Sequence, residues 1–338
     1  MKKGTIVSLI AIAAVVAVAM FAGCIEEETL TPTPEPMAPE VTQTPSPPPV
    51  LDDIQASDEV TVRIGAFNIQ VFGKSKAAKP EVMAVLGQII RTYDVVAVQE
   101  IRDASQTALP AMLDIVNAND SQYDYVVSER LGRTTSKEQY AYIYNNQTVE
   151  LTGASHTYPE PAGTDPFHRE PYIASFRAIN GNFDVTLIVI HTDPDEATEE
   201  INALEDVVKY AQRTYPDEQD FIVLGDLNAD GSYFNEDSAS TMNSSDYYWC
   251  INNSLDTTTK STNYTYDRII ITNQTVPDFC GESGVFRYDI EYGLTVNETI
   301  AVSDHYPVYA EFRRNRDMDS TAMPIATPAP EQNPLGEI

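Results

Sequence analysis

Short apolar runs separated by polar segments dominate the middle of this 338-residue chain. Residues 60–72 alternate between apolar and polar side chains and then become continuously apolar, which is typical of a strand buried in a sheet. Residues 81–93 place apolar side chains at intervals of three and four, which predicts a helix, and residues 94–100 form a second apolar run. Strand, helix and strand in this order predict the opening unit of an α/β sheet.

Further apolar runs predict more strands, and an amphipathic segment predicts one long helix over about residues 195–214. The runs cover residues 123–129, 140–146, 173–179, 184–192, 220–228, 267–273 and 307–312. Many short strands with few helices favour two sheets packed face to face, with helices outside. We therefore expect an α/β layered sandwich, and a single domain spanning residues 60–315.

The beginning of the chain reads as an export signal. Lys2 and Lys3 precede an apolar run that ends shortly before Cys24, which predicts a signal peptide over residues 1–23. Cys24 follows small residues and resembles the cysteine of a lipobox, so lipidation of Cys24 is one prediction. The alternative is an uncleaved membrane span, because about 18 apolar residues mark a transmembrane candidate. Both alternatives put the domain on the extracellular face of the membrane, lipid-anchored or tethered, unless it is secreted.

Two segments have compositions that cannot form a folded core. Residues 24–59 are rich in Thr, Pro and Glu with almost no aromatic side chains, which predicts an extended tether. Residues 316–338 have a similar composition, and we expect them to be a disordered tail.

The cysteines and the glycosylation motifs agree with an exported protein. With Cys24 assigned to the anchor, Cys250 and Cys280 remain, and they form either one disulfide or two buried free thiols. Seven N-x-S/T motifs also agree with an exterior location, at Asn119, Asn146, Asn243, Asn252, Asn263, Asn273 and Asn297.

The chain is strongly acidic, with a formal net charge of −30. Residues 60–312 contain 38 Asp and Glu against 16 Lys and Arg, so the predicted domain keeps a charge of −22. Such a surface repels polyanions, which argues against a nucleic-acid-binding module with a broad basic footprint. An acidic surface is nevertheless compatible with an enzyme that binds phosphate groups through a divalent metal and a few arginines. Solubility in a saline habitat is an alternative explanation of the charge.

Polar and ionisable side chains gather where the apolar runs start or stop: Glu100, His191, Asp226, Asn228, Asp267, Asp304 and His305. Each is unremarkable alone, since Gly225–Asn228 also suits an ordinary turn and Asp267 with Arg268 also suits a surface ion pair. Strand ends along one edge of a sandwich can nevertheless meet in one cleft.

The set of residue types suits the hydrolysis of a phosphate ester. Two of the four histidines, His191 and His305, have aspartates close in the sequence, and a carboxylate partner fixes the tautomer of an imidazole and raises its basicity. Hard oxygen ligands for Mg²⁺ or Ca²⁺ are offered by Asn68, Glu100 and Asp304. Arginine is the side chain suited to phosphate oxygens, and Arg102 and Arg169 are available.

Several short motifs, in their order and spacing, resemble those of a known family. The motifs are "FNIQVFG", "YDVVAVQEIRD", "SERLGR", "FHREP", "GDLNADGSY", "STNYTYDRI" and "SDHYPV". From about Val62 to Phe312 the chain resembles the endonuclease/exonuclease/phosphatase superfamily, in its deoxyribonuclease I-like branch. The resemblance implies a four-layered α/β sandwich of two mixed sheets with helices on the outer faces.

The resemblance also implies a role for each site residue. It places Asn68, Glu100 and Asp304 around Mg²⁺ or Mn²⁺. It pairs His305 with Asp267 to activate water, and His191 with Glu138 to protonate the leaving oxygen. It assigns Asp226 and Asn228 to the phosphorus centre or a second metal, and Arg102, Arg169 and Tyr266 to the substrate. Two structural Ca²⁺ sites would use Asp165, Phe167 and Glu170 in one loop, and Asp256, Thr258 and Thr262 in another.

Four positions depart from the pattern of this branch. Ser136 stands where a tyrosine stacks in the minor groove of DNA, and Gly231 and Tyr264 stand where a disulfide is usual. Lys260 lies within the second calcium loop.

The sequence thus predicts an exported, metal-dependent endonuclease that cleaves DNA to 5′-phosphate and 3′-hydroxyl ends. We expect a monomer attached to the membrane, with no protein partner. The alternatives are an esterase of the same fold acting on phospholipid or inositol phosphate, and a non-catalytic surface binding module.

Overall fold

The computed structural model describes residues 60–317. The predicted signal peptide, the tether, Cys24 and most of the predicted tail lie outside the described residues. Within residues 60–317, no helix combines the length and the apolar character needed to cross a membrane.

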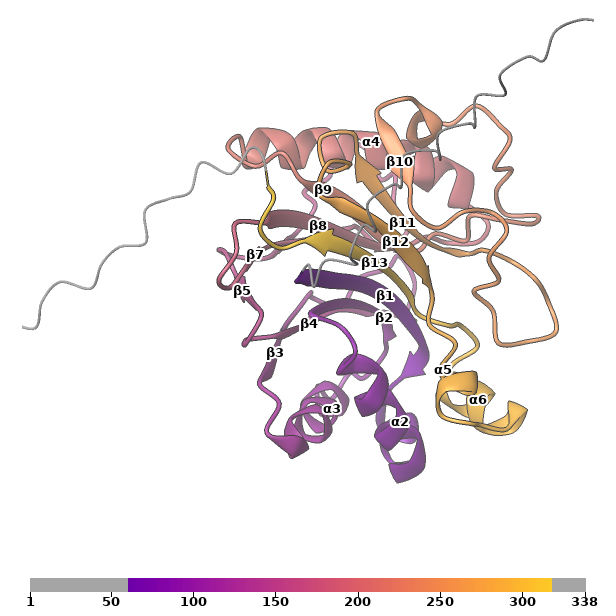
Figure 1. The fold of residues 1–338 in the computed structure, drawn as a ribbon. Helices are drawn as coiled ribbons and strands as arrows, with labels where there is room; N and C mark the ends of the chain where they lie inside the picture. Colours follow the sequence, from indigo (N-terminus) through magenta and orange to yellow (C-terminus); the bar gives the residue numbers. More distant parts are fainter. Residues whose placement is uncertain (1–59, 318–338) are drawn as a thin grey trace, which may run out of the picture. The chain divides into compact units, whose positions relative to one another are not determined.

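Two β-sheets pack face to face (Figure 1). The six-stranded sheet has the order β12-β13-β1-β2-β4-β3, and the seven-stranded sheet has the order β10-β11-β9-β8-β7-β5, with β6 paired to β7. The first sheet consists of β1 (Thr61–Phe72), β2 (Val95–Ile101), β3 (Tyr123–Val127), β4 (Gln139–Asn145), β12 (Phe279–Val285) and β13 (Val308–Arg313). The second consists of β5 (Val149–Leu151), β6 (His156–Thr157), β7 (Tyr172–Ala178), β8 (Asp184–His191), β9 (Phe221–Asp226), β10 (Tyr247–Trp249) and β11 (Asp267–Thr272).

Helices cover the outer face of each sheet (Figure 1). The six-stranded sheet carries α2 (Pro80–Ile90), α3 (Ala108–Val116), α5 (Tyr288–Glu291) and α6 (Val296–Val302), with the short α1 (Lys74–Ala77) ahead of α2. The seven-stranded sheet is covered by α4 (Ala197–Thr214). Two single-turn 3₁₀ helices, Asn117–Asn119 and Thr241–Asn243, complete the described elements. The predicted four-layered α/β sandwich is confirmed.

The alternation of side chains along the strands explains the layers. In β8, Val185, Leu187 and Val189 face the core between the sheets. Ile188 and Ile190, on the other face of the same strand, pack beneath α4. Side chains of a strand alternate between the two faces, and each buried aliphatic side chain contributes about 1.5–3 kcal/mol through removal from water. Strands that are apolar on both faces therefore hold a helix layer and a second sheet at once.

All nine predicted strands and both predicted helices are present, but several short elements escaped the sequence pattern. The unpredicted elements include α3, α6, β5, β10 and β12. The strand β12 contains Gly281 and Gly284 and lies at a sheet edge, where little apolar patterning is needed.

The strand directions bring distant segments to one edge of the sandwich. β1 runs parallel to β2, and β8 runs parallel to β9. Asn68 near the end of β1 contacts Asp226 at the end of β9, so these four strands end at the same edge. β4, β11 and β13 run antiparallel to them and therefore start there. This edge is called the active edge below, and the other end of the strands is called the far edge.

Of the two alternatives for Cys250 and Cys280, the disulfide is absent: Cys250 is a free thiol buried in the core between the sheets. The main-chain oxygen of Cys250 accepts a hydrogen bond from Ser283 Oγ at 2.7 Å. Burial raises the pKa of the Cys250 thiol to about 12, so this cysteine is an inert core side chain.

All six glycosylation-motif asparagines whose side chains the structure describes are exposed: Asn146, Asn243, Asn252, Asn263, Asn273 and Asn297. Their positions permit modification, but their use stays a prediction.

Candidate active site

His191, the last residue of β8, is held by a carboxylate from the neighbouring sheet. Its Nδ1 atom lies 2.8 Å from Oε2 of Glu138, which directly precedes β4. Its main-chain N–H donates to the hydroxyl of Tyr140 at 2.9 Å. The side chains of His191 and Glu138 are buried, at 7% and 2% exposure, so the orientation of the imidazole is fixed. The predicted pairing of His191 with Glu138 is thus present as a contact.

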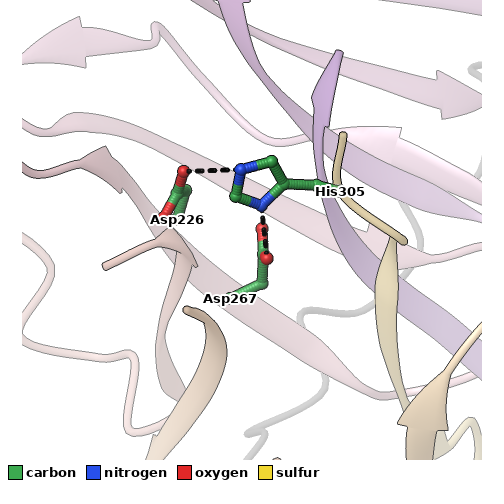
Figure 2. A group of neighbouring side chains, drawn as sticks. All are labelled: Asp226, Asp267 and His305. Atoms are coloured by element: carbon green, nitrogen blue, oxygen red, sulfur yellow. Dashed lines mark hydrogen bonds and ion pairs between the residues drawn. The ribbon is translucent and has the colours of Figure 1, made fainter. Parts of the chain in front are cut away.

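His305 forms an equivalent pair with Asp267 (Figure 2). Its Nδ1 atom lies 2.7 Å from Oδ2 of Asp267, the first residue of β11. Thr257 Oγ1 accepts hydrogen bonds from the main-chain N–H groups of Tyr266 and Asp267 and holds the start of that strand.

Asp226 connects the two pairs. Its Oδ2 atom lies 3.6 Å from Nε2 of His191 and 3.5 Å from Nε2 of His305. Asn68 Nδ2 donates to the same oxygen at 2.9 Å. Two imidazoles from opposite sheets therefore present their free nitrogens to one carboxylate oxygen, as required of an acid and a base that act on one small group.

The backbone next to Asp226 requires a glycine. Gly225 has φ +140°, and a Cβ atom there would lie 1.9 Å from the main-chain oxygen of Ile190. Only glycine tolerates both the positive φ and this close approach of β8 to β9. Gly225 and Asp226 therefore belong to the end of β9, which pairs with β8 at the site, rather than to an ordinary surface turn.

The charges of the site shift its pKa values in opposite directions. Burial opposes protonation of His305, but Asp267 and Asp226 outweigh it and raise the pKa of His305 to about 10. Burial and Arg169 likewise oppose the charge on His191, but Glu138 and Asp226 raise its pKa above the ordinary value. Burial disfavours the charge on Glu138, but His191 and the arginines lower its pKa to about 2. The site as described thus holds a cationic His305 imidazole among carboxylates.

Asn68 and Glu100 lie at irregularities in β1 and β2. The pairing of the two strands shifts register between Asn68 and Phe72, and β2 shifts against β4 before Ile101. Asn68 Nδ2 lies 3.2 Å from Glu100 Oε1, so the two side chains meet. A β-bulge changes the direction in which nearby side chains point. The two register shifts therefore allow the side chains of Asn68 and Glu100 to meet at the active edge.

The backbone around these residues is strained. Val71 has φ +52° and Glu100 has φ +59°, a region that is unusual for residues with a side chain and most unusual for a β-branched one. Val71 N–H donates to Glu100 Oε2 at 2.8 Å, which ties the two strained positions together. Strain of this kind gathers at functional sites.

Asp304 is paired with a lysine from the loop that the sequence assigned to calcium. Lys260 Nζ lies 2.9 Å from Asp304 Oδ2, and the Lys260 side chain is 54% exposed. Asp304 Oδ1 lies 3.9 Å from Nε2 of His305. A cation thus already contacts the predicted metal ligand.

The two predicted substrate arginines occupy different environments. Arg102 lies at the surface of the site, with its guanidinium 2.7 Å from Glu138 Oε1 and 3.0 Å from Glu100 Oε2. Its other nitrogen lies 3.4 Å from Ser136 Oγ, at the position that lacks the expected tyrosine. Arg169 is buried and donates to the main-chain oxygens of His191 and Thr192. Arg169 therefore holds the end of β8 in place, and its contact with substrate stays a prediction.

Aromatic rings flank His305. Tyr266 lies with its ring centre 6.3 Å from that of His305 and stacks on Tyr264 at 5.1 Å. A Cβ atom at Gly231 would meet the Tyr264 ring at 2.8 Å, so this ring packs on Gly231 at the two positions where the resemblance implied a disulfide.

Asn228 completes the catalytic set given by the sequence. It has φ +46°, its main-chain N–H donates to Asp226 Oδ1 at 3.1 Å, and its Nδ2 donates to the main-chain oxygen of Thr192 at 3.1 Å. Asparagine is enriched in this backbone region.

The two predicted calcium loops are closed by contacts within the protein. Asp165 lies 3.0 Å from Arg133 Nε, and Phe167 N–H donates to Glu160 in the loop that also holds Glu170. In the second loop, Asp256 Oδ1 accepts from the main-chain N–H and the hydroxyl of Thr258, which in turn donates to the main-chain oxygen of Thr262. Calcium at either loop stays a prediction.

Two residues that the sequence did not single out support the site. Lys76 Nζ is buried and donates to the main-chain oxygens of Ile69 and Val302, and burial lowers its pKa to about 8. Ser303 Oγ donates to the main-chain oxygen of Asn68. The basic segment around Lys76 resembles a solvated surface in the sequence, so its burial could not be predicted. Ser303 belongs to the motif "SDH" and could have been predicted as a site residue from that motif.

Comparisons with known proteins show the family of the chain. The model of the endonuclease/exonuclease/phosphatase family matches residues 65–305. Deoxyribonuclease-1 of Bos taurus is 35% identical over 259 residues, covering 74% of this chain and 91% of the relative. Deoxyribonuclease gamma of Mus musculus is 34% identical over 273 residues, covering 77% and 87%.

Solved structures share the fold at lower identity. A family protein from Bacteroides thetaiotaomicron gives a TM-score of 0.53 at 17% identity, covering 75% of this chain and 95% of that one. A mannosyl-6-phosphatase from the same organism gives 0.51 at 15% identity, covering 74% and 99%. These similarities support the architecture alone.

Sandwich and site together define a hydrolase of the layered α/β type. The chain belongs to the endonuclease/exonuclease/phosphatase family, in its deoxyribonuclease I-like branch.

Proposed function

We propose that this protein is a divalent-metal-dependent endonuclease that hydrolyses DNA phosphodiester bonds to 5′-phosphate and 3′-hydroxyl ends, exported and held at the outer face of the membrane. The observation that carries the proposed reaction is the pair of imidazole Nε2 atoms, each within 3.6 Å of Asp226 Oδ2. Sequence similarity to deoxyribonucleases supports DNA as the substrate. Export and tethering rest on the composition of residues 1–59.

The two histidines take opposite roles in this proposal. His305, oriented by Asp267, removes the proton from the attacking water. His191, oriented by Glu138, protonates the leaving 3′ oxygen. Each carboxylate fixes the tautomer that leaves Nε2 facing the substrate, which is the arrangement general acid–base catalysis requires. Arg102 and Tyr266 at the rim of the site hold the flanking nucleotides.

The residues present fit a hard divalent cation. Glu100 and Asp304 offer carboxylate oxygens and Asn68 an amide oxygen, which suits Mg²⁺, Mn²⁺ or Ca²⁺. The ammonium group of Lys260 on Asp304 shows that this position accepts positive charge. When bound, the cation would neutralise charge on the phosphate and lower the pKa of His305 toward the range in which it accepts a proton.

The direct test is incubation of the purified protein with supercoiled plasmid and millimolar Mg²⁺, with and without Ca²⁺. We expect nicked and then linear DNA, and no cleavage after chelation. We also expect ligatable 5′-phosphate ends, detected by a DNA ligase. Intact plasmid under all metal conditions, together with release of phosphate from inositol phosphates, would instead favour the esterase alternative.

The contact between Lys260 and Asp304 leads to a second prediction. Replacing Lys260 with alanine removes a competing cation, so the Mg²⁺ concentration for half-maximal cleavage should fall. An exposed ion pair contributes up to about 1 kcal/mol, which corresponds to a shift of up to roughly fivefold. The measurement is the cleavage rate at saturating DNA as Mg²⁺ is varied.

Lys209→Ala provides the matched control for this experiment. Lys209 also forms an exposed ion pair, with Glu205 on α4, away from the site. It should leave the Mg²⁺ midpoint unchanged. A midpoint that rises in Lys260→Ala would show that Lys260 assists the cation rather than competing with it.

A further inference from the structure

A second group of carboxylates lies at the far edge of the sandwich. Asp220 directly precedes β9, Asp278 directly precedes β12, and Asp317 follows β13. One oxygen of each lies within 4.8 Å of the others. Asp226 ends the same β9 strand at the active edge, so the two groups are about 20 Å apart.

The carboxylates are shielded from water. Asp220, Asp278 and Asp317 are 0%, 2% and 6% exposed. Buried like charges repel each other strongly unless a proton, a cation or hydrogen bonds offset them. Arg313 lies nearby and donates to the main-chain oxygens of Pro277 and Phe279, on either side of Asp278.

One oxygen of the group has no hydrogen-bond donor. Oδ1 of Asp278 is fully buried and accepts no hydrogen bond. A buried carboxylate oxygen almost always has a partner, so this one indicates a ligand or a proton at its position. Its surroundings contain other carboxylates, which accept hydrogen bonds and donate none when ionised.

The geometry points to a divalent cation: we propose that Asp220, Asp278 and Asp317 form a Ca²⁺ site at the far edge, separate from the catalytic metal. Ca²⁺ binds carboxylate oxygens at about 2.3–2.6 Å, so two oxygens of one ion lie at most about 5 Å apart. The spacing within this group satisfies that limit. Mg²⁺ suits the group less well because it demands near-ideal octahedral geometry at shorter distances.

The site joins three segments that are distant in the sequence. It links the start of β9, the turn before β12 and the segment that follows β13. Asp317 also accepts from the main-chain N–H of Asp184 at 3.4 Å, and its main-chain oxygen accepts from Asn182 Nδ2 at 2.7 Å. A cation here would therefore fasten the end of the described chain to both sheets.

The titration of the group agrees with this assignment. Burial, followed by the charge of Asp317, raises the pKa of Asp278 to about 6. Burial and Asp317 raise the pKa of Asp184 to about 7. A bound Ca²⁺ would offset the charge of Asp317 and lower the pKa of Asp278.

Hydrogen exchange of the full-length protein tests the proposal at the site itself. After chelation, adding Ca²⁺ should slow amide exchange in residues 182–184 and 313–317. The slowing should approach the ratio of the Ca²⁺ concentration to its Kd, which is about 100-fold at 100 times the Kd. Mg²⁺ at equal concentration should have a smaller effect.

Matched variants separate this site from the catalytic one. Asp278→Asn and Asp317→Asn should lose the Ca²⁺-dependent protection, whereas Asp304→Asn at the active edge should keep it. In chelator, Asp278→Asn should melt no lower than the wild type, because the substitution removes one of the clustered negative charges. Asp317 lies beyond the last strand, so its variant tests the site even if Asp278→Asn folds poorly.

Two outcomes would overturn the proposal. One is an absence of Ca²⁺-dependent protection in the wild type at 10 mM Ca²⁺, a concentration of order 10 times the weakest protein sites. The other is equal protection in the wild type, Asp278→Asn and Asp317→Asn, which would mean that Ca²⁺ acts elsewhere.

Discussion

Replacing His191 or His305 with alanine is expected to slow DNA cleavage by about 10²–10⁴-fold, the general scale of acid–base catalysis. Each imidazole has its own carboxylate partner, and both present Nε2 to the same oxygen of Asp226. Loss of either one removes a proton-transfer group from the transition state and leaves the shape of the cleft intact. The measurement is kcat/KM on plasmid at saturating Mg²⁺, with melting temperatures to confirm folding.

His156→Ala is the control for the histidine variants. His156 lies in β6 and contacts the hydroxyls of Tyr210 and Tyr215, away from the active edge. Its loss should leave the rate within about twofold of the wild type, since surface substitutions away from a site have small effects. If His191→Ala and His305→Ala retained full activity, the cleft would be a binding surface rather than a catalytic one.

Replacing Asp226 with asparagine is expected to lower kcat by about 10²–10³-fold, comparable to the loss of one preorganised electrostatic group. Asparagine keeps the shape of the side chain but loses the charge that faces both Nε2 atoms. KM for DNA should stay level or fall, because the variant removes a negative charge that faces the phosphate. Steady-state kinetics on an oligonucleotide duplex would separate kcat from KM.

The pH profile gives an independent reading of the Asp226 variant. Asp226 is one of the charges that raise the pKa of His305. Its loss lowers that pKa, so His305 becomes an available base at lower pH, and the acidic limb of the activity profile should move to lower pH. Asp246→Asn, at an exposed position, should leave both kcat and the profile unchanged. A kcat within tenfold of the wild type and an unmoved limb would remove Asp226 from the proposed reaction.

Much of the fold could be predicted because strand periodicity is a local property. The alternation in β8 assigns its side chains to two faces without knowledge of any other strand. Elements with little apolar pattern, such as β12 and α6, carry no such signal.

The site was predictable in its members but not in all its contacts. The motif "SDH" predicted His305, and the polar residues at the ends of two apolar runs, now β8 and β9, predicted His191 and Asp226. The contact of Lys260 with Asp304 depends on a loop conformation that no periodicity encodes. The bulges at Asn68 and Glu100 are likewise set by pairing between strands.

The sequence by itself determined which side chains are apolar on which face, and which acids, bases and ligands stand at strand ends. The tertiary structure alone decided that Cys250 forms no disulfide, that Arg169 holds main chain, and that Asp220, Asp278 and Asp317 meet at the far edge. The reason is physical: the face of a strand follows from neighbours two residues away, whereas contacts between residues far apart in the sequence depend on register, twist and loop path, which only the assembled sheets fix.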